Sequence, residues 1–365
     1  MGGRLKLILE QISRRKWLIA LLLTLGFVIV TVGLGYYSNL VIPGNPDHNA
    51  RYLAEPGTHL DFMSEWDGPH YIHIARYGYG QDSSLTAFFP LYPLLIRILL
   101  FVVRSPLISA LLTSWLCLFG ALYFYLKIVE KLFGPKIDTL LMGALLFLLF
   151  PGGVFLAATY YSSLLALVCL AAIYFGLEGR YFLAGLFCLL ASASHPVGIF
   201  TTVAVFLLLY EAKVGLIRRV IAAVLGFAGI GGYMIYLWVV QGKPLAFIGG
   251  QRQTHWLSGN YISAIAGSVT FVSLLLFVLV LISVIYWWRK RLSFAVYNLL
   301  YLLTPILGGN FAGYGRYILT AFPLQFMLLQ RFKRSTLGYS LILVSSAILW
   351  AYFVIHYAAG YTGGS

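Results

Sequence analysis

Charged residues are scarce in this chain. Only 10% of its 365 residues are Asp, Glu, Lys or Arg, and its mean hydropathy is +0.88, whereas soluble domains carry about 25% charged residues. The apolar residues form continuous runs of about 20, the length that crosses a bilayer as a helix. Lipid offers the backbone no partners and the runs do not alternate, so they predict helices rather than a barrel. The sequence therefore predicts an all-α polytopic membrane protein.

Cysteine is also rare, and several common motifs are missing. Cys117, Cys169 and Cys188 all fall inside apolar runs, which predicts small buried side chains rather than a disulfide framework or a metal site. The chain has no P-loop, Rossmann fingerprint or zinc-protease motif. It has no internal repeat, and we expect one domain over residues 1–365. It also has no Asn-X-Ser/Thr sequon, which fits a prokaryotic source and a plasma-membrane location.

The apolar runs predict eleven membrane-spanning helices. The basic segment 1–16 precedes an apolar run of about 22 residues, longer than a signal-peptide core, and predicts a retained first helix. Segment 88–104 is short and contains Arg97 and Arg104, so we interpret it as a helix lying in the membrane interface. The spans are expected at 17–38, 106–126, 138–157, 159–177, 181–194, 196–210, 220–240, 262–288, 293–306, 317–330 and 337–358.

The basic residues determine the expected orientation. If segment 88–104 does not cross the membrane, eighteen of the 25 Lys and Arg residues lie on the side of the N-terminus. The positive-inside rule then places the N-terminus in the cytoplasm and the C-terminus outside. The net charge of +14 follows from this topology, and we expect no nucleic-acid partner. Residues 39–104 become a large extracytoplasmic loop with short interfacial helices.

Acidic residues gather in that loop. Six of the eleven Asp and Glu residues lie between positions 39 and 87, and the polar run ends in Glu65-Trp66-Asp67-Gly68-Pro69-His70. A hydrophobic protein that collects carboxylates and imidazoles at one membrane face is expected to carry its chemistry there. The six acids are Asp47, Glu55, Asp61, Glu65, Asp67 and Asp82.

Five polar or proline-containing motifs follow one another along the chain. They are Trp66-Asp67 with His70-Tyr71 and Ala75–Tyr79, Phe88–Leu94, Phe150-Pro151 with Tyr160–Ser163, Gly242–Phe247 with Gln251-Arg252 and Trp256, and Gly315–Tyr317 with Phe322–Leu324. In this order they resemble the motifs of the PIG-V-like mannosyltransferases of the GT-C class, over most of the chain. Two departures are Ser163, where the family often has Glu, and His195, where it tends to have Arg.

The resemblance implies transfer of a hexose, expected to be mannose, from a polyprenyl-phosphate donor at the outer face with inversion. Such a donor carries its own leaving group, so the enzyme needs a base for the acceptor hydroxyl and a cation for the phosphate. The donor's lipid tail stays in the bilayer, which places its phosphate at headgroup depth. The acceptor, whether glycan, lipid or protein, stays open.

Asp67 is the candidate base, with Glu65 as its acidic companion. Asp67-Gly68-Pro69 also has the pattern of a helix N-cap, for a helix expected to run through Tyr77. Asp61 and Glu65 are four residues apart and are open to a second interpretation, as one solvated face. We name no metal ligand set and no cofactor, and we leave open that Glu65 and Asp67 share a divalent cation.

Arg316 follows a glycine-rich segment at the start of a helix, and we expect it to bind the donor phosphate across a cleft sized for a hexose. The alternative is an interfacial anchor for lipid headgroups. Seven further residues are expected to contact the donor, and each has a structural alternative. The alternative is a solvated side chain for the first two histidines, a helix break for the third, a lid or aromatic belt for the loop residues, and an aromatic belt for the tyrosines. The seven residues are His70, His73, His195, Gln251, Arg252, Tyr160 and Tyr161, with His255 and Trp256 in the same loop as Arg252.

Two other functions compete with sugar transfer. A transporter or flippase of lipid-linked or anionic substrates would also place polar residues at broken helices, but it predicts ionisable groups near mid-membrane and repeat symmetry. A non-enzymatic membrane subunit has no need for clustered carboxylates beside aromatic loops that carry arginine.

Overall fold

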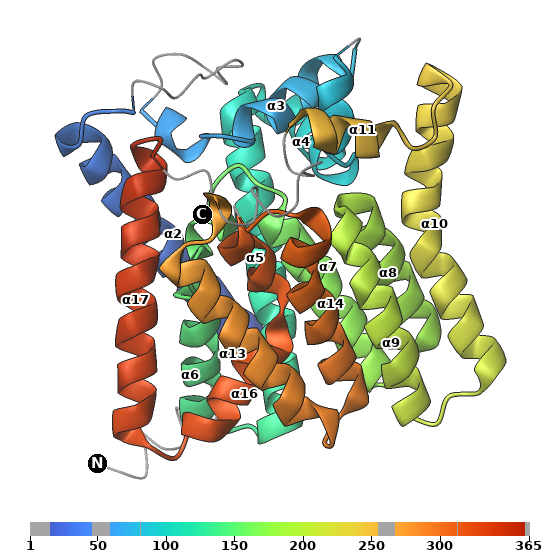
Figure 1. The fold of residues 1–365 in the computed structure, drawn as a ribbon. Helices are drawn as coiled ribbons and strands as arrows, with labels where there is room; N and C mark the ends of the chain where they lie inside the picture. The colour runs from blue at the N-terminus through green and yellow to red at the C-terminus, as the bar shows by residue number, and fades with distance from the viewer. Residues whose placement is uncertain (1–14, 46–58, 81, 255–266, 312, 362–365) are drawn as a thin grey trace.

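The computed structural model describes residues 15–45, 59–80, 82–254, 267–311 and 313–361. Within these ranges the chain is helical and contains no β-strand, which confirms the predicted all-α class. Figure 1 shows the long helices side by side, with α3, α4 and α11 together at one end of the bundle. His255, Trp256, Asp47, Glu55 and the first residues of the expected helix 262–288 lie outside the described ranges.

The helices follow the predicted apolar runs closely. The α-helices are α2 (Lys16–Val41), α3 (Gly68–Tyr77), α4 (Leu91–Val103), α5 (Pro106–Phe133), α6 (Ile137–Leu148), α7 (Ser162–Leu177), α8 (Tyr181–Ser194), α9 (Ile199–Glu211), α10 (Leu216–Gln241), α11 (Ala246–Gln253), α13 (Phe271–Trp288), α14 (Leu292–Gly308), α15 (Tyr314–Tyr317), α16 (Phe322–Phe332) and α17 (Thr336–Ala358). The 3₁₀ helices are η1 (Asp61–Met63), η2 (Ser83–Ala87), η3 (Gly153–Leu156), η4 (Pro196–Gly198) and η5 (Ile318–Thr320).

Five described helices are long and apolar enough to cross a membrane: α2, α5, α10, α13 and α17. Six further apolar helices are shorter, among them α4, α7 and α14. Together they make the chain a multi-pass membrane protein. The number of crossings, the orientation and the interfacial position of α4 stay predictions.

Proline and glycine interrupt two of the expected spans. The run 138–157 was expected as one helix, but α6 ends at Leu148 because Pro151 disfavours helical geometry in the residue before it. Gly152 follows with a φ of 82°, a left-handed conformation that glycine adopts without strain. The run 317–330 is likewise divided into α15, η5 and α16, with Pro323 in the first turn of α16. These breaks produce the irregular segments that carry the site.

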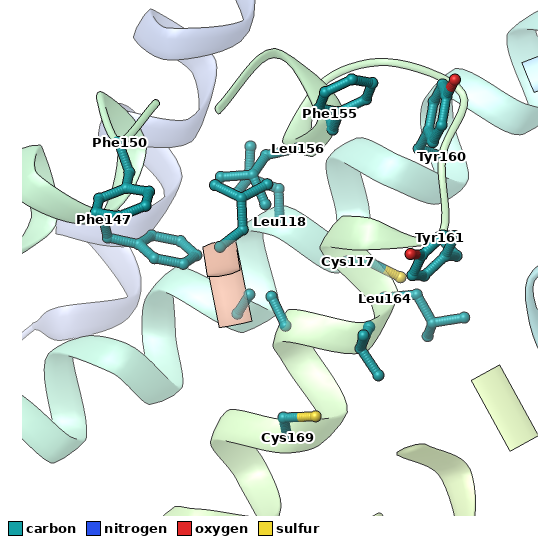
Figure 2. Close-up of a cluster of buried hydrophobic side chains, with 14 of the residues drawn as sticks. Cys117, Leu118, Phe147, Phe150, Phe155, Leu156, Tyr160, Tyr161, Leu164 and Cys169 are labelled. Atoms are coloured by element: carbon teal, nitrogen blue, oxygen red, sulfur yellow. The ribbon is translucent and has the colours of Figure 1, made fainter. Parts of the chain in front are cut away.

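The two irregular segments also touch each other. A side chain at Gly152 would place its Cβ 3.0 Å from the carbonyl oxygen of Gly315, so only glycine permits this backbone approach. The contact holds Arg316 against the segment that leads into α7. Figure 2 shows the buried cluster beneath that segment, with Phe155, Tyr160 and Tyr161 at its edge.

Charged residues separate to the two ends of the bundle. Three ion pairs join helix ends far from α3: Lys16 with Glu130 at 2.7 Å, Lys131 with Glu178 at 2.5 Å, and Arg291 with Glu211 at 3.6 Å. Glu178 directly follows α7, whose other end begins next to Tyr160 and Tyr161. A 16-residue helix is about 24 Å long, so the site described next lies at the opposite end from Glu178.

The cysteines have the predicted role. Cys117, Cys169 and Cys188 are free and buried, and Figure 2 shows the first two among apolar side chains. Burial raises the free energy of a thiolate, so these groups act as small apolar side chains.

Candidate functional site

Asp67 and Arg316 form a direct ion pair. The Nη1 atom of Arg316 lies 2.5 Å from the Oδ2 atom of Asp67, and the two side chains are 5% and 15% exposed. The residues are 249 positions apart in sequence. The prediction of a hexose-sized cleft between the two residues is wrong, because their side chains are in direct contact. Any substrate that uses both groups must therefore approach beside the pair or part it.

Asp67 occupies the N-cap position of α3, as the Asp-Gly-Pro pattern predicted, but its side chain makes no capping hydrogen bond. The carboxylate is directed to Arg316 instead. An N-cap side chain that accepts no hydrogen bond from the first turn of its own helix forgoes about 1 kcal/mol of helix stability. The carboxylate thus has a long-range partner in place of its local structural role.

Two tyrosines from distant parts of the chain, Tyr160 in the segment before α7 and Tyr357 in α17, hold the backbone around this carboxylate. The Tyr160 hydroxyl accepts a hydrogen bond from the Asp67 N–H at 2.9 Å and donates to the Glu65 carbonyl at 3.2 Å. The Tyr357 hydroxyl accepts from the Glu65 N–H at 3.0 Å. Tyr160 and Tyr357 are fully buried. The aromatic-belt interpretation of Tyr160 and Tyr161 is therefore wrong, since Tyr161 is also buried.

The turn before α3 is tightly packed. A Cβ at Gly68 would lie 2.2 Å from the Thr159 hydroxyl oxygen and 2.9 Å from that of Ser64. Trp66 adopts a left-handed φ of 58°, a conformation that costs a bulky residue about 1–3 kcal/mol. The Asp67 backbone is thus held in one place by contacts and by a strained neighbour.

Aromatic rings surround the Arg316 guanidinium. Its carbon lies 5.3–5.5 Å from the ring centroids of Phe155, Tyr160 and Tyr317. The Nε–H has no hydrogen-bond partner among the described residues. A buried donor without a partner is costly, and an acceptor oxygen, such as one of a phosphate, would satisfy it. The headgroup-anchor interpretation of Arg316 is wrong, because the side chain is buried inside the protein.

Glu65 lies two residues before Asp67 and has an unusual pKa. Burial, with a smaller contribution from the charge of Asp61, raises its pKa to about 7. Asp61 lies in η1 and Glu65 in the turn that follows, so the two acids do not form the solvated helical face that was the alternative interpretation. At neutral pH a large fraction of Glu65 is therefore protonated and able to donate a hydrogen bond.

His195 joins the site through ring contacts. Its ring stacks on Tyr161 with centroids 4.3 Å apart and planes 5° from parallel, and it lies 5.8 Å from Tyr317. It is 8% exposed and sits at the predicted break between α8 and η4. His70 stacks on Phe88 at 4.9 Å.

Three predicted donor contacts are not brought to the ion pair by any described hydrogen bond or ion pair. His73 faces Tyr77 at 5.1 Å, and partial burial lowers the pKa of this histidine. Gln251 and Arg252 lie on α11, which packs on η2, and Arg252 is exposed. Within the described residues no three His, Cys, Asp or Glu side chains gather closely enough to hold a metal ion.

Sequence reasoning missed Tyr357, Phe155, Thr159 and Gly68 as parts of the site. Tyr357 lies in the last helix, 292 residues from Glu65, and no local pattern indicates such a contact. Gly68 carried a weak signal, since Asp-Gly-Pro combines an N-cap residue with a residue that leaves space. Phe155 was hidden by the mistaken continuous helix 138–157.

The fold and site define a multi-pass, all-α membrane protein with a buried acid–arginine pair at one end. Residues 53–214 match the family model described as Mannosyltransferase (PIG-V). This match covers the Asp67 loop, Phe88–Leu94 and Tyr160–Ser163, and it confirms the family resemblance for the motifs within this range. Over these residues the chain is similar to the PIG-V mannosyltransferases.

Curated relatives agree with this match. The chain is 29% identical over 194 residues to GPI alpha-1,6-mannosyltransferase 2 of Cricetulus griseus, covering 47% of this chain and 38% of that protein. The Mus musculus protein of the same name is 28% identical over the same length and shares. The Homo sapiens protein is 29% identical over 167 residues, with 40% of this chain and 33% of that protein covered. The chain thus aligns with little more than a third of the length of these relatives.

Proposed function

We propose that the protein is an inverting glycosyltransferase that moves a hexose, mannose in the first instance, from a polyprenyl-phosphate donor to an acceptor hydroxyl at the extracytoplasmic membrane face. The observation that carries this proposal is the Asp67–Arg316 pair, with its unpartnered Arg316 Nε–H, inside an aromatic enclosure at one end of the bundle. The family match to mannosyltransferases supports the reaction class.

Arg316 supplies the cation that the leaving phosphate needs. A guanidinium binds phosphate oxygens through two parallel N–H donors, and the buried Nε–H of Arg316 is such a donor without a protein partner. Arrival of the phosphate would draw the guanidinium from Asp67. The ion pair is then the resting arrangement, and donor binding frees the carboxylate next to the reacting sugar.

Asp67 supplies the base. Its carboxylate takes the proton from the acceptor hydroxyl as the acceptor oxygen bonds to the anomeric carbon, while the bond from that carbon to the phosphate oxygen breaks. Polyprenyl phosphate leaves with the bonding electrons, and Arg316 balances its charge. One displacement inverts the anomeric centre, so one carboxylate suffices. Tyr160 holds the Asp67 backbone in position for this step.

The distribution of charge favours transfer over transport. The five long apolar helices carry their few Asp, Glu, Lys and Arg residues in the first turn or the last two turns, with none in mid-helix where a transporter would place coupling groups. The acidic site instead lies at one end, where a lipid phosphate resides.

The donor class can be tested directly. Purified protein in detergent is mixed with radiolabelled polyprenyl-phosphate mannose, polyprenyl-phosphate glucose or GDP-mannose, and the release of labelled sugar to water or to added acceptors is measured. We expect turnover from the lipid-phosphate mannose and none from the nucleotide sugar. Turnover from GDP-mannose alone would overturn the proposal, as would transport of the intact lipid without any bond cleavage.

A further inference from the structure

The first turn of α7 carries two buried serines whose hydroxyls are unsatisfied. Ser162 and Ser163 are 2% and 0% exposed, and neither Oγ atom makes a hydrogen bond within the part of the chain that the structure describes. A buried hydroxyl without a partner is costly, because water no longer satisfies it. Two such hydroxyls in succession therefore indicate that a bound group supplies the missing partner.

The same turn of α7 has no side-chain cap for its backbone donors. α7 begins at Ser162, and the side chain of its N-cap residue, Tyr161, makes no capping hydrogen bond. The first N–H groups of a helix have no acceptor inside the helix, and the first backbone bond described in this turn runs from the Leu165 N–H to the Tyr161 carbonyl at 2.8 Å. The helix dipole also favours negative charge at this end. The start of α7 thus offers both N–H and O–H donors.

The serine hydroxyls and these N–H groups are directed toward the same end of the helix. The Cα–Cβ bonds of an α-helix tilt toward its N-terminus, so the side chains of Ser162 and Ser163 extend toward the segment that precedes α7. Figure 2 shows Tyr160 and Tyr161 on that segment, with Leu164 on the first turn of α7. A group bound at this end would therefore meet the hydroxyls and the N–H groups together.

The two residues before this turn connect it to the ion-pair site. The Tyr160 ring centroid lies 5.3 Å from the guanidinium carbon of Arg316. The Tyr161 ring stacks on His195, and the His195 ring lies 5.8 Å from that of Tyr317, the residue after Arg316. α7 also packs on η5, which begins directly after Tyr317. The start of α7 and the unsatisfied Nε–H of Arg316 thus adjoin one another.

We propose that the hydroxyls and N–H groups of Ser162 and Ser163 bind the phosphate of the lipid donor together with Arg316. The inference rests on the proposed function, which brings a phosphate to Arg316. All of these groups can donate hydrogen bonds, and a guanidinium beside a helix N-terminus selects an oxyanion. The donors are buried while Arg316 contacts Asp67, so the phosphate reaches them as that pair parts. The start of α7 then shares with Arg316 the charge of the leaving phosphate.

Removing the two hydroxyls distinguishes a ligand role from a structural one. Because they make no hydrogen bond to the described protein, the double variant Ser162→Ala/Ser163→Ala should keep the thermal stability of wild type. Ser109→Ala is the matched control, since Ser109 is a buried serine with an unsatisfied hydroxyl in the first turn of α5, which the Ser105 side chain caps. Binding of geranyl phosphate, geraniol and phosphatidylglycerol to the three detergent-purified proteins is measured by calorimetry, together with thermal stability.

We expect the double variant to bind geranyl phosphate roughly tenfold more weakly than wild type, because hydrogen bonds to a charged group are the strong ones. Its binding of geraniol, which has no phosphate, should be unchanged, and Ser109→Ala should match wild type for both ligands. Wild-type affinity of the double variant for geranyl phosphate would overturn the inference, as would an equal loss in Ser109→Ala. Tighter binding of phosphatidylglycerol than of geranyl phosphate would assign the site to a bulk phospholipid and overturn it too. A less stable double variant would show that the hydroxyls have a structural role instead.

Geranyl phosphate carries no sugar, so its binding is measured independently of transfer. Mannose transfer by wild type, with unchanged geranyl phosphate binding in the double variant, would leave the proposed function standing and remove the α7 site. Serine-dependent binding of geranyl phosphate, with no transfer from any lipid-phosphate sugar, would instead remove the proposed function and leave a phosphate site.

Discussion

A buried arginine is stable only with a partner, and in this protein the partner of Arg316 is Asp67, the proposed base. Removing one member of a buried pair leaves an uncompensated charge, which typically costs about 3–5 kcal/mol, whereas removing both costs far less. Arg316 and Asp67 are 5% and 15% exposed. Loss of activity in a single variant therefore reports on chemistry only when its folding is measured alongside.

A double variant separates the two effects. We expect Arg316→Met to lower the thermal stability of the detergent-purified protein by about 3 kcal/mol, and Asp67→Asn in the same chain to recover most of that loss. Sugar transfer should remain absent in the double variant. Recovery of transfer together with stability would show that the pair is only structural.

Glu65 gives the site a dependence on pH. Its pKa in the folded protein is about 7, above the ordinary value of 4.5. Between pH 4.5 and pH 7 the folded protein therefore keeps a proton on Glu65 that the unfolded chain has lost. Stability therefore falls as pH rises from about 4.5 through 7. Thermal melts across this range should show the decline in wild type and a flatter profile in Glu65→Gln. Parallel profiles for the two proteins would contradict the assignment.

The sequence singled out Asp67, Arg316 and Tyr160, because their polar chemistry stands out in an apolar chain, and the structure brings these three residues together. Their roles in transfer stay predictions. The direct contact between Asp67 and Arg316 was not predictable, because it depends on how two segments 249 residues apart meet. Gln251 and Arg252 have equally suitable chemistry, and only the position of α11 separates them from the pair.

Among the structural elements, the turn into α3 controls the position of the acid. Gly68→Ala would push a methyl group into Thr159, whose hydroxyl lies 2.2 Å from the new Cβ position. We expect a loss of about 1–3 kcal/mol from this overpacking and a fall in transfer rate as Asp67 moves. Gly231→Ala on α10 is the control, since its Cβ meets no atom within 4 Å. Equal behaviour of the two variants would argue against the tight turn.

The last helix supports the same turn. Tyr357→Phe removes the hydroxyl that accepts from the Glu65 N–H, and we expect a loss of about 1–2 kcal/mol with a reduced transfer rate. Tyr352→Phe alters the same helix at a residue that is 47% exposed and should change neither property. A Tyr357→Phe protein with wild-type stability and rate would exclude α17 from positioning the acid.

Helix positions were largely predictable from apolar runs, and the breaks were not. His195-Pro196 was recognised as a break because an ionisable residue and a proline interrupt the run. Pro151-Gly152 was overlooked because apolar residues continue on both sides. The consequence of that break, the approach of Gly152 to Gly315, depends on tertiary packing that periodicity does not encode.

For the whole molecule, the ion pairs are divided between the two ends of the helix bundle, and this division distinguishes the two membrane faces. Three ion pairs lie toward one end and the Asp67–Arg316 pair toward the other. The all-α membrane class followed from composition alone, since a chain with 10% charged residues cannot cover a soluble surface. The positive-inside rule predicts that the Asp67 end faces outward, which would bring the acid to the leaflet where the proposed lipid donor is presented.

The central claim is that Asp67 acts as the base, and its most direct test is a single-turnover measurement on a variant of this residue. Labelled polyprenyl-phosphate mannose is mixed with excess purified wild type, Asp67→Asn or Asp82→Asn, and the release of mannose from phosphate is followed in time. Asp82 is the control because it is an acid of the same loop whose side chain accepts from the Ser84 N–H at the start of η2. The account predicts a fall of about 10²–10⁴-fold for Asp67→Asn and a near-normal rate for Asp82→Asn. A folded Asp67→Asn protein that releases mannose at the wild-type rate would contradict it.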